Sequence, residues 1–237
     1  MPNIKKLVEL AENHNQQGLA GQLDGFSFSH RCSDAKKLKA FFNKPNNVTV
    51  SLLFIDIEDF VKNHLTKNVK DLSKLLDKYY QTVTKIIHEH NGTVEKLIGD
   101  GIICVFGKPF FNDTIDKSFK NAFNCAKKVI KTCKSKGFPV KIAFHSGKIM
   151  YYKPKSEVFE EYTMIGEALA KLYRLESVGK VNCIVFDDKG YKRLVKNFQT
   201  LTPANQKKEL AKIEEREEVR MPNYETETVY CYNSLSL

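Results

Sequence analysis

Apolar positions in the first half of the chain predict a strand, an amphipathic helix and a hairpin. Residues 48–56 are nearly all apolar and rich in β-branched side chains, which is typical of a strand buried on both faces. Apolar residues then recur every three or four positions over 71–87, and Asn91-Gly92 ends the pattern, so we expect a helix there. Two β-rich runs follow at 93–98 and 102–106, and the Gly99-Asp100-Gly101 linker between them predicts a tight hairpin.

The second half of the chain continues the alternation. Its expected elements are a capped amphipathic helix over 113–137, strands over 140–145 and 148–152, a helix over 168–178 and a strand over 181–186. The order β-α-β-β-α-β with additions predicts an α+β fold in which helices pack over one sheet.

The two ends of the chain lack this regular alternation. We interpret residues 1–45, which contain two short helical patterns around a glycine-containing stretch, as an N-terminal helical appendage. Pro45 and the asparagines after it mark the start of the main domain, 46–237. Near the C-terminus, 200–220 is charged and weakly patterned, and 227–232 predicts a final edge strand.

The composition fits a single globular domain. The chain has 237 residues, of which 42% are apolar and 28% charged, so it can bury one sizeable core. No apolar run approaches the ~18 residues of a membrane helix, and the N-terminus lacks the apolar segment of a signal peptide, so we expect a cytoplasmic protein with no membrane partner. The six cysteines form no CxxC pair and no zinc-type cluster, which favours free thiols.

Positive charge is concentrated in one part of the chain. The formal net charge is +10, and the stretch from Lys120 to Lys155 contains ten lysines and no Asp or Glu. Such a stretch is either a solvated helix face or an attractor of polyanions, triphosphate or nucleic acid. We favour the solvated face and do not expect nucleic-acid binding, because no stacking aromatic residues alternate with the lysines.

Two aspartates occupy positions where chemistry is possible. Asp56 directly follows the apolar strand and Asp100 lies at the hairpin tip, so a central sheet can bring both to one edge. Carboxylates that face one cavity repel each other unless a divalent cation neutralises them, and two such cations suit phosphoryl transfer. Aspartates at strand ends and turns are more often simple capping residues, and the spacing alone favours that explanation.

Three blocks of sequence resemble the motifs of class III adenylate and guanylate cyclases. Residues 54–60, FIDIEDF, resemble the family's F-x-D-I-x-x-F, and 95–107, EKLIGDGIICVFG, resemble its K-x-x-G-D followed by an apolar strand ending in F-G. The third block, EYTMIGEA at 161–168 with RLE at 174–176, resembles D-Y-T-x-I-G-D and the later R-L-E. The resemblance covers about 48–190 in the family's order, and it implies a ferredoxin-like βαββαβ core with extra C-terminal strands.

The resemblance implies a metal and triphosphate site. Asp56 and Asp100, with the backbone carbonyl of Ile57, would hold two divalent metal ions per site, Mg²⁺ or Mn²⁺. The triphosphate would bind the backbone amides at the start of the following helix, which are those of Glu58, Asp59, Phe60 and Val61.

The resemblance also implies a base-binding and transition-state site. Lys96 and Thr163 match positions that contact the base, and Arg174 matches the arginine that stabilises charge at the α-phosphoryl group. Each has an ordinary alternative in isolation, as a solvated strand lysine, a common strand residue and half of a helix ion pair. In the family the two sets of residues come from opposite subunits of a head-to-tail dimer, so a chain with both sets implies a homodimer with two sites.

Three positions depart from the family pattern. Ala170 replaces the asparagine that orients the ribose, four residues before the arginine, and this loss implies a rate lower by ~10²-fold. Val61 replaces a small or hydroxyl residue, and Glu167 replaces a common aspartate.

The substrate base stays open. Lys96 with Thr163 is similar to the purine-contacting pair of bacterial adenylate cyclases, which favours ATP. The lack of a sensor domain, the altered third block and the chain length instead resemble stand-alone pyrimidine cyclases of bacterial anti-phage (Pycsar-type) signalling. Those enzymes make cyclic CMP or cyclic UMP for a separate effector, and the two interpretations are about equally supported.

Two other classes of function are alternatives to the enzyme. A cyclase-fold protein that binds nucleotide or a partner without turnover would fit Ala170, and a nucleic-acid binder would fit the lysine-rich stretch. Manganese-dependent release of pyrophosphate separates the enzyme from both, and steep salt dependence of nucleic-acid retention would favour the second.

Overall fold

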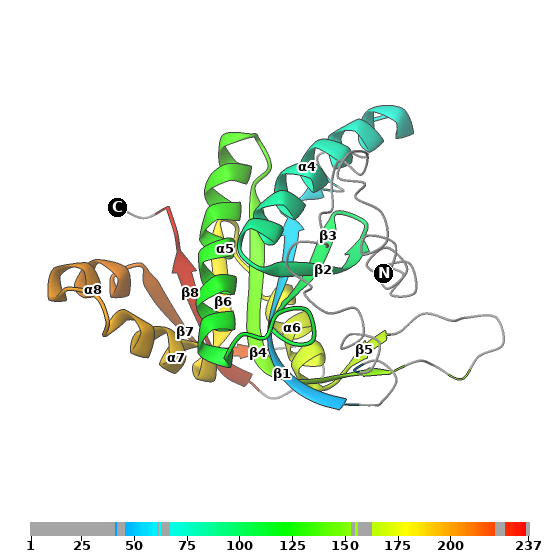
Figure 1. Ribbon diagram of the computed structural model, residues 1–237. Helices are drawn as coiled ribbons and strands as arrows, with labels where there is room; N and C mark the ends of the chain where they lie inside the picture. The colour runs from blue at the N-terminus through cyan, green and yellow to red at the C-terminus, as the bar shows by residue number, and fades with distance from the viewer. Residues whose placement is uncertain are drawn as a thin grey trace, which may run out of the picture.

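One mixed sheet forms the centre of the molecule. The computed structural model describes residues 41, 46–60, 62, 67–152, 155, 163–220 and 226–235. Within them an eight-stranded sheet has the order β2-β3-β1-β4-β6-β8-β7, and β5 pairs with β4. Helices cover both faces of this sheet (Figure 1). The helical appendage expected at 1–45 lies outside the described residues, apart from Phe41.

The first half of the sheet has the ferredoxin-like arrangement. Its elements are β1 (Asn46–Ile57), α4 (Val69–Glu89), β2 (Gly92–Ile98), β3 (Gly101–Phe106), α5 (Ile115–Ser135) and β4 (Val140–Tyr152). β1 is central and antiparallel to both neighbours, with Leu53 opposite Cys104 on β3 and Phe144 on β4. The expected α+β fold with a βαββαβ core and a β2–β3 hairpin is confirmed.

Helices α4 and α5 pack on one face of the core. Asn68 accepts a hydrogen bond from the Asp71 amide at the start of α4, and Thr114 accepts one from the Lys117 amide at the start of α5. Their apolar residues recur at helical spacing, so one stripe of each helix is buried against β1, β3 and β4.

The opposite face is covered by α6 (Glu167–Ser177), which follows the short strand β5 (Thr163–Ile165). A Cβ atom added at Gly147 on β4 would lie 2.9 Å from the Cβ of Ala168, so the glycine allows α6 to approach the sheet closely. The ring of Tyr173 on α6 packs edge-on against Phe54 of β1, with centroids 5.5 Å apart.

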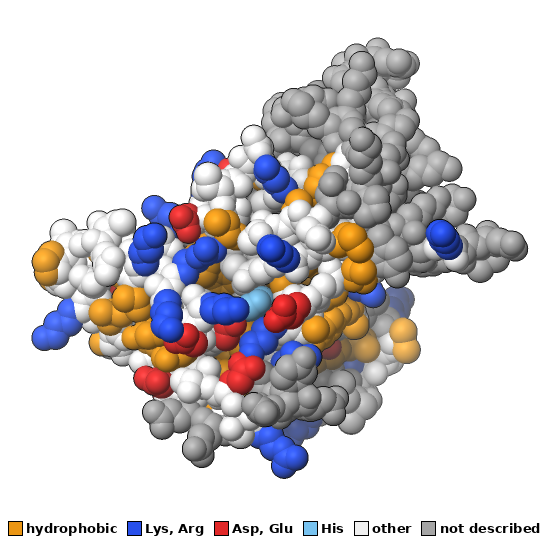
Figure 2. Space-filling model, turned by 90° about the horizontal axis from the view of Figure 1, so that it is seen from below, with side chains coloured by type: hydrophobic (Ala, Val, Ile, Leu, Met, Phe, Trp, Pro, Cys, Tyr) orange, Lys and Arg blue, Asp and Glu red, His pale blue; other side chains and the backbone are white. Residues whose placement is uncertain are grey.

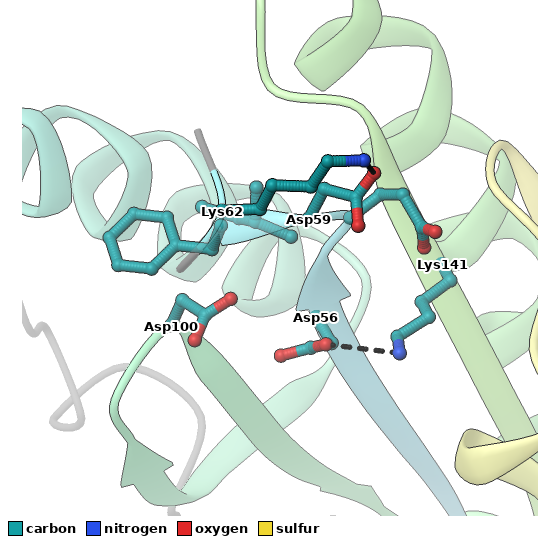
Figure 3. Close-up of a pocket in the computed structure, with 8 residues that line it drawn as sticks. Asp56, Asp59, Lys62, Asp100 and Lys141 are labelled. Atoms are coloured by element: carbon teal, nitrogen blue, oxygen red, sulfur yellow. Dashed lines mark ion pairs between the residues drawn. The ribbon is translucent and has the colours of Figure 1, made fainter. Parts of the chain in front are cut away.

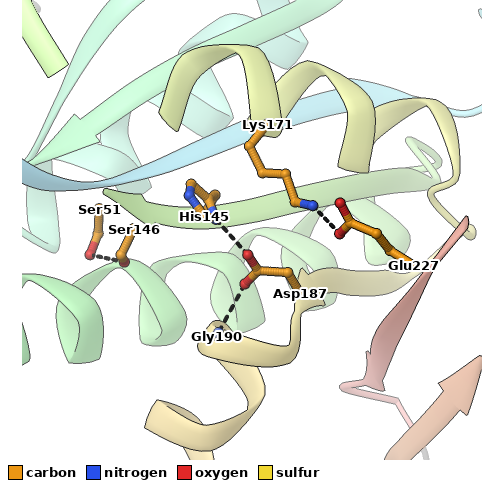
Figure 4. Close-up of polar contacts among 7 residues, drawn as sticks. All are labelled: Ser51, His145, Ser146, Lys171, Asp187, Gly190 and Glu227. Atoms are coloured by element: carbon orange, nitrogen blue, oxygen red, sulfur yellow. Dashed lines mark hydrogen bonds and ion pairs between the residues drawn. The ribbon is translucent and has the colours of Figure 1, made fainter. Parts of the chain in front are cut away.

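The C-terminal part extends the sheet. It consists of β6 (Cys183–Asp187), α7 (Asp188–Phe198), α8 (Pro203–Leu210), β7 (Ile213–Arg220) and β8 (Thr226–Asn233). Asp187 caps the start of α7 by accepting a hydrogen bond from the Gly190 amide at 2.9 Å. Its carboxylate also lies 3.3 Å from Nδ1 of His145 (Figure 4). The prediction of a final edge strand is wrong in its position, because β8 lies between β6 and β7 and the edge belongs to β7.

Two other expectations from the sequence need correction. The segments 140–145 and 148–152 form one continuous strand, β4, because β1 pairs along its whole length and the Ser51 and Ser146 hydroxyls meet at 2.7 Å. The region 200–220, which its sequence pattern describes only as charged and weakly patterned, forms α8 and β7, and α7 precedes it. Its apolar residues are few, but they pack against the sheet around Tyr230 and Tyr232.

The lysine-rich region is consistent with a solvated helix face. On α5, Lys120, Lys128, Lys131 and Lys134 are exposed, whereas the intervening apolar residues are buried. The five cysteines in the described part of the chain are buried free thiols. Among the described helices, none combines the length and the apolar character that crossing a bilayer requires.

Candidate functional site

The two predicted metal aspartates lie at the same edge of the sheet. Asp56 is near the end of β1, and Asp100 lies in the turn between β2 and β3. Because β1 pairs antiparallel with β3, with Ile55 opposite Ile102, the register brings Asp56 beside this turn. Figure 3 shows both carboxylates facing one pocket.

The turn that presents Asp100 is held by the neighbouring helix. Gly99 has a positive φ of 58°, a conformation that glycine adopts at little cost. The Tyr80 hydroxyl of α4 donates a hydrogen bond to the Gly99 carbonyl. Sequence pattern and tertiary contact therefore both direct Asp100 toward the pocket.

The pocket has a volume of about 530 Å³ and is strongly charged. It is lined by Asp56, Ile57, Glu58, Asp59, Phe60, Lys62, Asp100 and Lys141. Four of these side chains are acidic and two are lysines, so the pocket has an excess of negative charge.

Lys141 forms an ion pair with Asp56 inside this pocket. Its Nζ atom lies 3.4 Å from Oδ2 of Asp56 and 2.8 Å from Oε1 of Glu176. Burial by itself would lower the pKa of Lys141, but the hydrogen bond and charge of Glu176, with the charge of Asp56, raise it.

The Asp56 carboxylate remains incompletely neutralised. Burial and the charge of Asp100 raise the pKa of Asp56 to about 6, although the Lys141 ammonium opposes the shift. A divalent cation between the two aspartates would remove this repulsion.

The donor set fits a hard divalent cation such as Mg²⁺ or Mn²⁺. Asp56 and Asp100 provide carboxylate oxygens, and Ile57 also lines the pocket. No group of three or more His, Cys, Asp or Glu side chains able to hold a metal occurs among the described residues. Two carboxylates completed by backbone, water and substrate phosphates are the usual protein environment of Mg²⁺.

The loop after β1 forms one wall of the pocket. The Glu58 amide donates a hydrogen bond to the Pro139 carbonyl at 2.8 Å. The sequence predicted that this amide binds the triphosphate, but its hydrogen atom is already engaged in the backbone contact. Asp59 adopts a positive φ of 52°, which is uncommon for a non-glycine residue, and its carboxylate lies 3.7 Å from the Lys62 ammonium. Asp59 and Phe60 line the pocket, whereas Val61 lies outside the described residues.

The other three predicted site residues lie outside this pocket. Lys96 is exposed on β2 after a bulge in the β2–β3 pairing, and Thr163 begins β5 opposite Tyr152. Arg174 is half-buried on α6, on the sheet face opposite α4 and α5. None of the three lines the pocket around Asp56 and Asp100.

Lys141 was not identified from the sequence. Its position in a β-rich run gave no local signal, since a lysine in such a strand is usually solvated. The β1–β4 register places it directly opposite Asp56, and only this pairing reveals that it belongs to the pocket.

Comparison with known proteins identifies the family. A family model described as the adenylate and guanylate cyclase catalytic domain matches residues 42–233. Uncharacterized proteins of Mycobacterium tuberculosis and Mycobacterium bovis are 26% identical over 132 residues, which are 55% of this chain and 24% of each relative. The match therefore spans about a quarter of the length of these relatives.

Solved structures share the fold. The catalytic core of a rhodopsin-guanylyl cyclase with converted specificity, in complex with ATPαS, has a TM-score of 0.66 at 18% identity and covers 81% of this chain and 99% of that chain. The adenylyl cyclase CyaB from P. aeruginosa has a TM-score of 0.64 at 17% identity, over 80% of this chain and 95% of that chain. The guanylate cyclase domain of RhGC from Catenaria anguillulae, in complex with GTP, has a TM-score of 0.64 at 18% identity, over 79% and 97%. With the matched family model, these similarities show that the chain belongs to the family of adenylate and guanylate cyclase catalytic domains.

Proposed function

We propose that this protein converts a nucleoside triphosphate into a 3′,5′-cyclic nucleoside monophosphate and pyrophosphate. The observation that supports it most directly is the shared pocket of Asp56 and Asp100, which come from separate strand ends. In the reaction the 3′-oxygen forms a bond to the α-phosphorus. The bond between the α-phosphorus and the oxygen that bridges to the β-phosphorus breaks, so that pyrophosphate leaves, and the 3′-hydroxyl proton passes to solvent.

In our proposal, different residues of the pocket bind the metal ions and the phosphates. Two divalent cations, when bound, supply charge neutralisation at the triphosphate and a lower pKa at the 3′-hydroxyl. Asp56, Asp100 and the Ile57 carbonyl hold them in our proposal. The amides of Asp59, Phe60 and Val61 bind the phosphates in this proposal. Lys62 and Lys141, which line the pocket, add positive charge to it.

A second copy of the chain completes each site in this proposal. Lys96, Thr163 and Arg174 do not line the pocket of Asp56 and Asp100, which supports a site built from two chains. Apolar side chains near them are unusually exposed: Leu97 at 46%, Ile98 at 40%, Ile165 at 39% and Tyr173 at 39%. A head-to-tail homodimer would cover these side chains and bring Arg174 of each chain to the α-phosphate of the opposite site.

Two classes of substrate base, adenine and a pyrimidine, belong to this proposal. Lys96 and Thr163 are compatible with contacts to adenine, and a pyrimidine nucleotide remains an equal alternative. The structural relatives include an adenylyl cyclase and guanylyl cyclases, so this fold accepts more than one base. We propose that the cyclic nucleotide is made in the cytoplasm and is bound by a separate effector, as an anti-phage messenger if the base is a pyrimidine.

One experiment tests the enzymatic proposal. The purified protein is incubated with each of the four ribonucleoside triphosphates and Mn²⁺, and the products are identified by mass spectrometry. We expect one cyclic product with equimolar pyrophosphate, and no product from Asp56→Ala or Asp100→Ala. Equal product from wild type and both variants would contradict the assignment of this pocket.

A regulatory protein without turnover is the second candidate. Ala170, exposed on α6 one turn before Arg174, replaces the residue that orients the ribose in the family. Saturable nucleotide binding with no product from any of the four triphosphates would favour this candidate. Retention of RNA or DNA that falls steeply with salt would instead favour a lysine-mediated nucleic-acid binder.

A further inference from the structure

Between residues that the structure describes, two ion pairs join α6, the helix that contains Arg174, to the sheet. Lys171 pairs with Glu227 of β8 (Figure 4). Near the C-terminal end of the helix, Glu176 pairs with Lys141 of β4 at 2.8 Å. The second pair differs from the first because its lysine also contacts Asp56 at 3.4 Å.

Lys141 is therefore shared between the metal pocket and α6. The side chains of Lys141, Asp56 and Glu176 are only 23%, 19% and 19% exposed, so their charges are partly removed from water. The Lys141 ammonium group contacts the carboxylates of both Asp56 and Glu176. A stronger interaction with one of these carboxylates weakens the interaction with the other.

We infer that Lys141 is a positioning residue that couples cation binding at Asp56 to the placement of α6. The inference rests on the proposed role of Asp56 as a metal ligand. A divalent cation on Asp56 repels the Lys141 ammonium, which then pairs with Glu176 alone. Glu176 thereby assists cation binding by giving the displaced lysine a partner, and the strengthened pair fixes the helix two residues beyond Arg174.

The coupling has a consequence in the proposed homodimer. Asp56 of one chain serves one active site, and Arg174 of the same chain serves the other. Cation loading at the first site thus helps to position the transition-state arginine at the second. By thermodynamic linkage, anything that orders α6 favours cation binding at the Asp56 of the same chain to the same extent.

The test measures Mn²⁺ binding to the full chain by calorimetry or by electron paramagnetic resonance, without nucleotide. Glu176→Gln should weaken Mn²⁺ binding about fivefold, because Lys141 then competes fully for Asp56. Lys141→Met should tighten binding by a similar factor, because the competing cation is gone. In the double variant, Glu176→Gln should have no further effect.

Matched variants separate this coupling from general damage. Glu227→Gln removes the other anchor of α6 without touching the pocket and should leave Mn²⁺ affinity unchanged. With arginine in place of Lys141 (Lys141→Arg), a cation is again present, so Glu176→Gln should again weaken Mn²⁺ binding, as it does not in Lys141→Met. Circular dichroism melts establish that each variant is folded before binding is compared.

Hydrogen exchange tests the helix directly. Adding Mn²⁺ should slow exchange of the amides at 170–177 in the wild type but not in Lys141→Met. Wild-type affinity in Glu176→Gln, or an equal loss in Glu227→Gln, would overturn the coupling. If the coupling fails in this way but Asp56→Ala abolishes Mn²⁺ binding, the proposed function stands without the coupling. A wild-type protein that binds no Mn²⁺ would overturn both the coupling and the proposed metal site.

Discussion

At the scale of single residues, Asp56 is held in an unfavourable electrostatic state. Burial is the main cause that raises the pKa of Asp56 to about 6, the charges of Asp100 and Glu176 add to the shift, and Lys141 opposes it. Buried groups with strongly shifted pKa values are concentrated at functional sites. The most direct physical reason for this arrangement is a cation that binds here and reverses the penalty.

Replacing Arg174 should damage the chemical step more than substrate binding. We expect Arg174→Ala to lower kcat by roughly 10²–10³-fold, because a planar cation stabilises charge mainly in the transition state. Nucleotide binding, measured by calorimetry, should change only a few-fold. Arg193→Ala, which removes a surface arginine on α7, is the control and should leave kcat unchanged. An Arg174→Ala defect confined to KM would argue for ground-state binding instead.

Glu95 should make stability depend on pH. Its side chain is 6% exposed, and burial raises its pKa to about 7 although the Tyr151 hydroxyl donates to it at 3.2 Å. Between the ordinary carboxyl value of 4.5 and about 7 the native state holds one more proton than the unfolded chain. The free energy of unfolding should therefore fall as pH rises through this window, by on the order of 3 kcal/mol, and stay level above it.

Urea unfolding at pH 5, 6, 7 and 8 measures this dependence. Glu95→Gln should reduce the slope to the part that Asp56 contributes below about pH 6, and it should be more stable than the wild type at pH 8, because no charge is then buried at position 95. Glu89→Gln, at an exposed position on α4, should keep the wild-type slope. An unchanged slope in Glu95→Gln would show that another group is responsible.

At the scale of secondary-structure elements, Gly166 determines how α6 begins. It connects β5 to α6 with φ +141°, and a Cβ atom there would lie 2.8 Å from the Lys148 carbonyl oxygen. The obstacle is backbone, which cannot rotate away as a flexible side chain would. The start of α6, and with it the direction of the helix that contains Arg174, depends on this close contact.

Gly166→Ala should therefore shift or loosen the start of α6. We expect a loss of about 2–4 kcal/mol in the free energy of unfolding, from the combination of backbone strain and overlap. Gly137→Ala is the matched control, since φ is +81° but nothing lies within 4 Å of its added Cβ. This control should cost only about 1 kcal/mol. Equal losses in chemical denaturation would show that the contact with β4 is unimportant.

At the scale of the whole molecule, the proposed chemistry is divided between two regions of one chain. The metal pocket lies at the sheet edge formed by β1 and the β2–β3 turn, and Arg174 lies on α6. Two chains arranged head to tail would unite these regions twice. The exposed apolar residues of β2, β5 and α6 are the expected contact surface.

Mixing two inactive variants tests this division. In a 1:1 mixture of Asp56→Ala and Arg174→Ala, half of the randomly formed dimers contain one chain of each kind, and each has one intact site of two. We expect about a quarter of wild-type activity to return. Asp56→Ala mixed with Asp100→Ala should regain none, because both defects affect the metal half. No recovery in the first mixture would contradict a shared site.

The sequence by itself determined the elements of the core and the positions of the two aspartates. Apolar residues at a period of two or of 3.6 report which side of a strand or helix is buried, so β1, α4, α5 and the hairpin could be predicted locally. The three motif blocks also indicated the family that the fold and the matched family model confirm. Glycine and aspartate at the hairpin identified the turn that presents Asp100.

Tertiary structure alone decided which distant residues share the pocket. Lys141 faces Asp56 because of the β1–β4 register, and β8 lies inside the sheet because β7 pairs with its outer side. The continuity of β4 and the placement of α7 and α8 likewise depend on packing against strands remote in sequence. Local periodicity reports burial but not the partner, and pairing between distant segments is therefore settled only when the whole core assembles.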